Sequence, residues 1–275
     1  MAIITLTTDY GNKDYSVSSL KAKLISEIDD INIVDITHDI SPFNLAEAGY
    51  VLEGAFSEFP KGTIHILSVD SELTPENKHI AIMYDGSFFI GADNGVFSLI
   101  FRDIKPDQIV DINLHSNYNY DISADELFVK VASHVNRSGP LNVVGSEIDT
   151  IKEITNLRPV INKEMNQIIG SVIYIDNYGN VVTNITEKLF KEISKTRPFT
   201  INARNVKFSK IHKNYSDAID FNLEKKDREE DGKKIALFNN LGYLQLSVYR
   251  SNPQTVGSAS TLFGLNYRDA VSVYF

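Results

Sequence analysis

The sequence contains no cysteine and no tryptophan in its 275 residues. The absence of cysteine excludes disulfide bonds and thiolate metal ligands. No apolar run approaches the roughly 20 residues that a membrane-spanning helix needs. The first residues, MAIITLTTDYG, lack the basic segment of a signal peptide and are typical of a β-strand. These absences predict a soluble, cytoplasmic protein that does not associate with a membrane.

Basic residues are in deficit, with 27 Lys and Arg against 36 Asp and Glu, so the formal net charge is −9. A negative chain repels the phosphates of nucleic acids, which excludes them as expected partners. Hydrophobic residues make up 43% and charged residues 23%, as in ordinary soluble globular proteins. The length allows one large domain or two smaller ones.

Several common functional motifs are also missing. The chain has no GxGxxG after its first strand and no GxxxxGK[ST], which argues against dinucleotide and P-loop sites. It has no HExxH and no GxSxG, and its six histidines show no metal-ligand spacing. We interpret His38 and His65 as residues at strand ends or in satisfied polar contacts. The sequence therefore predicts no metal site and no cofactor.

The first half of the chain alternates strand and helix patterns. Short apolar runs predict strands, and apolar residues at helical spacing follow several of them, as in Val17, Leu20 and Leu24. Asn44 followed by Glu47 fits a capping box before a further helix. Repeated units of this kind predict an α/β domain over residues 1–155 with a largely parallel sheet. An antiparallel α+β sheet is the alternative.

The pattern changes after about residue 150. Helical spacing becomes rare, and short strand-like runs follow at fairly even intervals, beginning with Ile168 to Ile175 and ending with Ala270 to Tyr274. One helix, Glu187 to Ile193, interrupts them. This pattern predicts a smaller, all-β domain of barrel or sandwich type over residues 165–275.

Two acidic residues follow predicted strands directly. Asp9 ends the run Ala2 to Thr8, and Asp70 ends the run Ile64 to Val69. Ligands of doubly wound sheets bind at the carboxyl ends of the strands, and a carboxylate suits a ribose diol, an amine or a cationic centre. The alternative is that each is an ordinary turn or helix-cap aspartate.

The most distinctive local string is YIDNYGNVVTNI, Tyr174 to Ile185. Its polar centre, Asp176 to Asn180, predicts a tight turn between two strands. A functional interpretation uses the Asp and Asn side chains for recognition and Tyr178 as a flat stacking face. The spacing alone does not decide between a plain hairpin and a binding turn.

Taken together, these strings resemble the S-adenosyl-L-methionine (SAM) hydrolase family, also called SAM hydroxide adenosyltransferases, to which SAM-dependent chlorinases and fluorinases are related. The resemblance covers both halves of the chain in the family's order. The matching segments are Ile4 to Gly11, Ile33 to Leu52, Phe59 to Asp70, Phe89 to Ser98, Tyr174 to Ile185 and Asn239 to Val248. It implies an α/β N-terminal domain and a β-rich C-terminal domain.

The resemblance also implies a set of substrate-binding residues. Asp9 would bind the ribose diol, and Phe43 occupies a position that is aromatic in the halogenases and packs beside the ligand. Asp176 would hold the methionine amino group. Tyr178 and Asn180 would contact the adenine.

Two further positions belong to the same expected site. Asn240 stands where the family commonly has a serine near the adenine, and Val248 falls in the strand whose backbone contacts the adenine edge. SAM carries a sulfonium and an ammonium group, which an acidic pocket suits. The resemblance implies a homotrimer whose site combines one subunit's N-terminal domain with its neighbour's C-terminal domain.

The hydrolases of the family use water or hydroxide to attack the ribose 5′ carbon, and an Asp, an Arg and a His surround that water. Here Asp70 fits the Asp, but Asn77 stands at the position of the Arg and Ser123 at that of the His. Neither is a cation or a base at neutral pH. Lys78 or His79 could replace the missing cation if the loop is rearranged.

The sequence therefore predicts a SAM hydrolase that releases adenosine and L-methionine, with Asp70, Asn77 and Ser123 at the catalytic positions and reduced activity. Losing positioned acid–base groups costs about 10²–10⁴-fold in rate. Two alternatives stay open. One is a non-catalytic protein that binds SAM or adenosine, and the other is an enzyme that uses a halide or another nucleophile on SAM.

Overall fold

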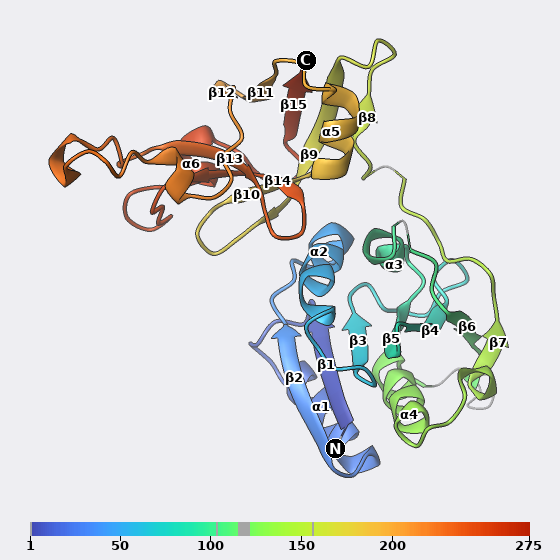
Figure 1. The fold of residues 1–275 in the computed structure, drawn as a ribbon. Coiled ribbons are helices and arrows are strands. Elements are labelled where there is room, and N and C mark those ends of the chain that lie inside the picture. The colour runs from blue at the N-terminus through green and yellow to red at the C-terminus, as the bar shows by residue number, and fades with distance from the viewer. Residues whose placement is uncertain (1, 103, 115–121, 156) are drawn as a thin grey trace. The chain divides into compact units, whose positions relative to one another are not determined.

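The computed structural model describes residues 2–102, 104–114, 122–155 and 157–275. The chain divides into two compact units, Met1–Ile154 and Thr155–Phe275 (Figure 1). Among the described residues, no helix has the length and apolar character to cross a membrane.

The first unit is built on a seven-stranded sheet in the order β2-β1-β3-β5-β4-β6-β7. Its first four strands in that order are parallel, and the other three pair antiparallel at one edge. This mixed sheet confirms the α/β prediction and its parallel core. The strands are β1 (Ala2–Thr8), β2 (Ile31–Thr37), β3 (Ile64–Ser68), β4 (His79–Tyr84), β5 (Ser87–Ala92), β6 (Gln108–Ile112) and β7 (Gly145–Glu147).

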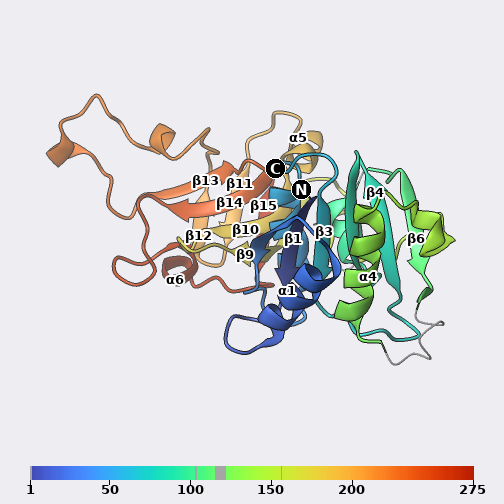
Figure 2. The same cartoon turned by 90° about the horizontal axis from the view of Figure 1, so that it is seen from below.

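Helices cover both faces of this sheet because its central strands are apolar on both sides. α1 (Ser16–Glu27) and α4 (Ala124–Asn136) pack on one face, in front of the strands in Figure 2. α2 (Leu45–Phe56) and α3 (Val96–Ile100) pack on the other. The predicted cap of α2 is confirmed, since Asn44 Oδ1 accepts the Glu47 backbone N–H at 3.2 Å.

The second unit is an antiparallel sheet in the order β12-β11-β15-β9-β10-β14-β13, with β8 paired to β9. One half of β9 pairs with β15 and the other half with β10, so the sheet curls along this strand. The all-β prediction is confirmed. The strands are β8 (Val160–Ile161), β9 (Gln167–Ile175), β10 (Val181–Thr186), β11 (Thr200–Ala203), β12 (Val206–Phe208), β13 (Lys234–Phe238), β14 (Tyr243–Val248) and β15 (Ala270–Tyr274).

Two helices and several short elements complete the second unit. α5 (Glu187–Ser194) is the predicted helix, and α6 (Ala259–Phe263) is an addition that the sequence pattern did not predict. The strands β7, β8 and β12 were also missed, because two or three residues are too few to show an alternating pattern. Short 3₁₀ helices lie at Ser216–Ala218 and Lys225–Asp227 in this unit and at Leu141–Val143 in the first unit.

Candidate functional site

The two predicted carboxylates leave the same edge of the first sheet. β1 and β3 are parallel neighbours with Thr8 opposite Ser68, so Asp9 and Asp70 both extend from carboxyl ends. Asp9 Oδ2 accepts the Phe43 backbone N–H at 3.0 Å. Phe43 has a φ of +62°, and its side chain is 72% exposed. The fold therefore brings Asp9 and Phe43 together and leaves an aromatic ring uncovered beside the carboxylate.

Asp70 lies in a turn that distant residues hold. Its backbone has a φ of +47°, a conformation that aspartate tolerates better than most residues. The buried Asn94 amide donates to the Val69 carbonyl at 2.9 Å and to the Asp70 carbonyl at 3.1 Å. Within the described part of the chain, no group hydrogen-bonds the Asp70 carboxylate. Both of its oxygens therefore remain to accept hydrogen bonds from a ligand or a water.

Asn77 is engaged by a residue that the sequence analysis did not consider. Its Oδ1 accepts from the Lys152 ammonium at 3.0 Å, and its backbone N–H donates to Thr74 Oγ1 at 2.9 Å. The structure thus places a cation against Asn77, although no cation occupies that position in the sequence. Lys152 is 75 residues away along the chain, so no local pattern could have found this contact.

The two residues suggested as replacement cations have other contacts. The Lys78 ammonium pairs with Asp111 at 2.6 Å. His79 is 1% exposed, and its Nε2 lies 2.8 Å from the backbone oxygen of Ser71. The edge of its ring packs against Phe128 with centroids 4.9 Å apart. His79 therefore anchors the turn after Asp70 from within the core.

Ser123 is the N-cap of α4. Its hydroxyl accepts the Glu126 backbone N–H at 3.3 Å, and the Glu126 carboxylate accepts the Ser123 backbone N–H at 3.4 Å. This reciprocal capping box satisfies two donors at the helix end. The Ser123 hydroxyl, which the sequence analysis predicted at a catalytic position, therefore has a structural partner in Glu126.

A polar cluster that the sequence analysis missed lies beside Asp9 and Asp70. The Tyr10 hydroxyl donates to Asp125 Oδ1 at 2.7 Å and lies 2.7 Å from Ser68 Oγ, which lies 2.9 Å from Ser71 Oγ. We call these four residues the hydroxyl cluster. Burial, together with the Asp125 charge, raises the pKa of Tyr10 well above its ordinary value. The positions of Tyr10 and Ser71 directly after the two predicted acids were the available signal.

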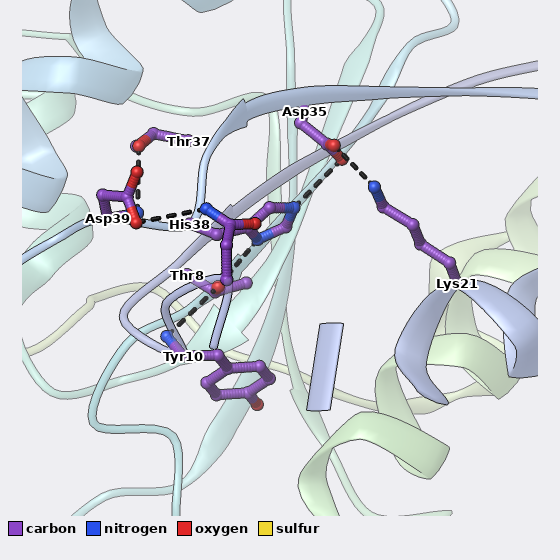
Figure 3. Close-up of polar contacts among 8 residues, drawn as sticks. Thr8, Tyr10, Lys21, Asp35, Thr37, His38 and Asp39 are labelled. Carbon is purple, nitrogen blue, oxygen red and sulfur yellow. Dashed lines mark hydrogen bonds and ion pairs between the residues drawn. The ribbon is translucent and has the colours of Figure 1, made fainter. Parts of the chain in front are cut away.

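A second buried network fixes the end of β1 (Figure 3). The His38 side chain is 3% exposed, with Nδ1 2.9 Å from Thr8 Oγ1 and Nε2 3.0 Å from Asp35 Oδ1. The Lys21 ammonium pairs with the same carboxylate at 2.5 Å. Burial raises the pKa of Asp35, but the hydrogen bonds from Lys21 and His38 outweigh it, and the pKa ends below its ordinary value. Since Thr8 Oγ1 also accepts the Tyr10 N–H at 3.4 Å, this network positions the chain at Asp9.

In the second unit, residues 176–180 form the predicted turn between β9 and β10. Asp176 Oδ1 accepts the backbone N–H groups of Tyr178 and Asn180, each at 2.9 Å, and Oδ2 accepts the Asn180 side-chain amide at 2.7 Å. Asp176 therefore builds the turn with its own side chain. A carboxylate has about four acceptor positions, so one remains for an ammonium group.

Three of the four predicted adenine contacts, Tyr178, Asn180 and Val248, line one pocket in the second unit. This pocket, of about 420 Å³, is lined by Tyr178, Asn180, Tyr215, Val248, Arg250, Ser251 and Asn252. Tyr178 is 64% exposed, whereas Asn180 is 4% exposed. Asn180 Oδ1 is buried without a hydrogen-bond partner among the described residues. A buried acceptor of this kind is costly unless a ligand or a water supplies a donor.

Asn240 lies apart from this pocket. It is exposed in the turn that joins β13 to β14, whereas Val248 is at the far end of β14 and pairs with Lys234. Tyr243 to Val248 spans roughly 17 Å. Within a single copy of the second unit, the fold therefore does not bring Asn240 to the residues that line the pocket.

A larger pocket, of about 700 Å³, lies at the opposite, amino-terminal edge of the first sheet, lined in part by Ala2 and Gly62. Among the described residues its one charged lining side chain is Lys61, and that ammonium pairs with Asp85 at 2.5 Å. A lining without carboxylates does not suit a cation. The carboxyl edge therefore remains the better candidate in the first unit.

Sequence comparisons match both units. Residues 4–145 match the SAM hydroxide adenosyltransferase N-terminal domain, and residues 170–272 match the SAM hydroxide adenosyltransferase C-terminal domain. The chain is 29% identical to an (R)-S-adenosyl-L-methionine hydrolase from Methanocaldococcus jannaschii over 99% of this chain and 96% of that protein. It is 22% identical to a fluorinase from Actinopolyspora mzabensis over 66% and 71% of the two chains.

A structural comparison agrees over the full length. An uncharacterized conserved protein from Thermotoga maritima superposes with a TM-score of 0.78 and 25% identity, and the match covers 100% of both chains. A conserved hypothetical protein from Thermus thermophilus gives a TM-score of 0.69 at 19% identity, which bears on the fold alone.

Proposed function

The chain belongs to the SAM hydroxide adenosyltransferase family, and on that premise we propose that it hydrolyses SAM to adenosine and L-methionine. Water attacks the ribose 5′ carbon, the bond from that carbon to sulfur breaks, and the sulfonium becomes a neutral thioether. Because the leaving group is already activated by its charge, the protein mainly has to align the reacting atoms and accept a proton.

The observation that carries the proposal is the pair of carboxylates at one sheet edge. Asp9 and Asp70 extend from parallel neighbours, and the Asp70 oxygens have no partner within the described residues. An unpaired carboxylate beside a sulfonium gains Coulomb energy and can orient an incoming water. Asp9 then holds the ribose diol, and Phe43 packs beside it.

The pocket of the second unit supports the same substrate. The exposed Tyr178 ring offers a stacking face for adenine, and the unpaired Asn180 Oδ1 is an acceptor for its exocyclic amine. Val248 contributes the pocket wall. The remaining acceptor position of Asp176 takes the methionine ammonium. We place Asn240 outside this contact set.

The proposal includes a homotrimer, as the family resemblance implies. Light scattering on the purified protein measures this directly. The expected mass is three times the 30.9 kDa of one chain. A mass of one chain at assay concentration, with activity intact, would contradict this part of the proposal.

The deciding experiment incubates the protein with SAM at neutral pH and separates the products by chromatography. Because the M. jannaschii relative is an (R)-S-adenosyl-L-methionine hydrolase, the two sulfonium epimers are assayed separately. We expect adenosine and methionine in equal amounts from the (R) epimer, above spontaneous breakdown. A parallel assay with chloride checks the halide alternative, which predicts a 5′-chlorinated nucleoside instead.

A second candidate function is SAM or adenosine binding without turnover. The specific observation in its favour is that Asn77 is bound to Lys152 and that Ser123 caps α4. Intact SAM after incubation, together with calorimetric binding, would favour this function over hydrolysis.

A further inference from the structure

The hydroxyl cluster has a defined direction of hydrogen bonding. Tyr10 has one hydroxyl hydrogen, and it goes to Asp125 Oδ1 at 2.7 Å. Ser68 then donates chiefly at the 2.7 Å contact with Tyr10, since its own contact with Asp125 Oδ1 is longer at 3.4 Å. Ser71 in turn donates at the 2.9 Å contact with Ser68. The shortest contacts therefore run from Ser71 through Ser68 and Tyr10 to the Asp125 carboxylate, beside the longer direct contact of Ser68 with the same oxygen.

The two ends of this chain differ in burial. Ser68 is fully buried at 0% exposure, whereas Ser71 is half-buried and directly follows Asp70. Since the Ser71 hydrogen points to Ser68, its oxygen lone pairs remain to accept from a water. A water that donates one hydrogen to Asp70 and the other to Ser71 has a lone pair left for the 5′ carbon.

We propose that Ser71, Ser68 and Tyr10 relay a proton from the attacking water to Asp125, which serves as the terminal base in place of the family's histidine. The inference rests on the proposed hydrolysis. As the water oxygen bonds to the 5′ carbon, the electron pair of the carbon–sulfur bond stays on sulfur. One water proton moves to Ser71, and each hydroxyl passes its own proton onward until one reaches Asp125.

The surroundings fit a relay of neutral hydroxyls. Burial and the Asp125 charge raise the pKa of Tyr10, so the phenol keeps its proton at neutral pH and transfers it only in a concerted step. His79 holds the Ser71 backbone oxygen at 2.8 Å, and Asn94 holds the carbonyls of Val69 and Asp70. These buried anchors fix the entrance of the relay.

Asp125 also lies in the first turn of α4, where a negative charge stabilises a helix. The cluster could therefore act only as a tie between α4 and the sheet. Tyr10→Phe and Ser71→Ala separate the two roles, because each removes one relay hydroxyl while keeping most packing. Tyr84→Phe in β4 is the matched control, since that ring packs against Phe101 away from the cluster.

The test measures SAM turnover of the purified full chain in water and in mixtures with D₂O. We expect Tyr10→Phe and Ser71→Ala each to lower kcat by roughly 10²-fold with KM within about 2-fold. The wild-type rate should fall non-linearly with deuterium fraction, which indicates several protons in flight, and both variants should lose that curvature. Ser71→Thr keeps the hydroxyl and should restore both the rate and the curvature.

The outcomes are distinguishable from failure of the proposed function. If the wild-type protein releases no adenosine, the proposed hydrolysis and the proposed relay are both contradicted. If it turns SAM over while both variants keep the wild-type kcat and isotope dependence, only the relay is overturned. A third outcome is that Tyr10→Phe has a lower melting temperature while Ser71→Ala keeps the wild-type isotope dependence. That result would show that the cluster only links α4 to the sheet, and it would also overturn the relay.

Discussion

The two units hold their candidate site residues by opposite means. In the second unit, Asp176 builds its turn with three hydrogen bonds to residues two and four positions away. In the first unit, Asn94 and His79 fix the turn at Asp70 from other strands and loops, and the Asp70 carboxylate makes no bond within the described residues. The Asp176 carboxylate is a structural part of its turn, whereas the backbone at Asp70 is fixed by other residues and its carboxylate stays available for a ligand.

This difference indicates where sequence change is tolerated. A turn built by its own side chain loses those hydrogen bonds when that side chain changes, so its sequence is tied to its geometry. A turn held by remote anchors keeps its backbone while the exposed positions change. The family resemblance predicts substitutions at Asn77 and Ser123 in the first unit and a matching turn from Asp176 to Asn180 in the second.

The largest expected effect comes from removing the unpaired charge. Asp70→Asn keeps the shape of the side chain and tolerates the positive φ, so the free energy of unfolding should stay within about 0.5 kcal/mol. Turnover of SAM should fall about 10²–10⁴-fold because the carboxylate no longer orients the water. Steady-state kinetics and urea unfolding measure the two quantities. A wild-type kcat in this variant would show that Asp70 takes no part in the reaction.

The second expected effect comes from a buried ionisable group of the first unit. Burial lowers the pKa of His65 to about 4, whereas an unfolded histidine titrates near 6.5. Between these values the unfolded chain binds more protons, so the stability present above pH 6.5 is lost as the pH falls toward 4. The free energy of unfolding should drop by about 3 kcal/mol between pH 7 and pH 4 from this group.

His65→Phe should remove most of that pH dependence, since the new ring can still stack on Phe89 as His65 does. Urea unfolding at several pH values measures the slope. An unchanged slope in His65→Phe would show that His65 is not the group responsible.

Much of the fold follows from patterns within single segments. The run Ala2 to Thr8 became β1 with the same bounds, and Asn44 with Glu47 marked the start of α2. Both features depend on neighbouring residues, which is why one sequence predicts them. The parallel order of the strands followed from their alternation with helices. The five-residue α6 and the shortest strands carry too few residues for any periodicity.

The candidate site was predicted only where its contacts are local. The turn at Asp176 could be read from the string itself, and Asp9 and Asp70 from the ends of their strands. The contact between Tyr10 and Asp125 joins residues 115 positions apart, and that between Asn77 and Lys152 joins residues 75 apart. Such contacts depend on strand order and on loop paths, which no spacing along the chain encodes.

The third effect should appear in the second unit as combined loss of stability and binding. Asp176→Ala removes three hydrogen bonds to a carboxylate, and we expect the free energy of unfolding to fall by about 2 kcal/mol. SAM affinity should weaken by roughly 1.5–3 kcal/mol, because the methionine ammonium loses its acceptor. Calorimetry measures the affinity, with Asp70→Asn as the matched variant from the first unit. Unchanged stability would contradict the self-contained turn.

The smallest effect tests whether Ser123 belongs to the chemistry or to the helix. Its hydroxyl accepts the Glu126 backbone N–H, and replacing a serine N-cap with alanine costs about 1 kcal/mol. Ser123→Ala should therefore lower the free energy of unfolding by that amount while kcat changes less than about 3-fold. Ser123→Asp, which retains a capping oxygen and adds a charge at the helix N-terminus, should restore stability. A fall in kcat of about 10-fold or more in Ser123→Ala, with SAM affinity intact, would instead show that the hydroxyl takes part in the reaction. The candidate site of the first unit would then include the N-terminus of α4.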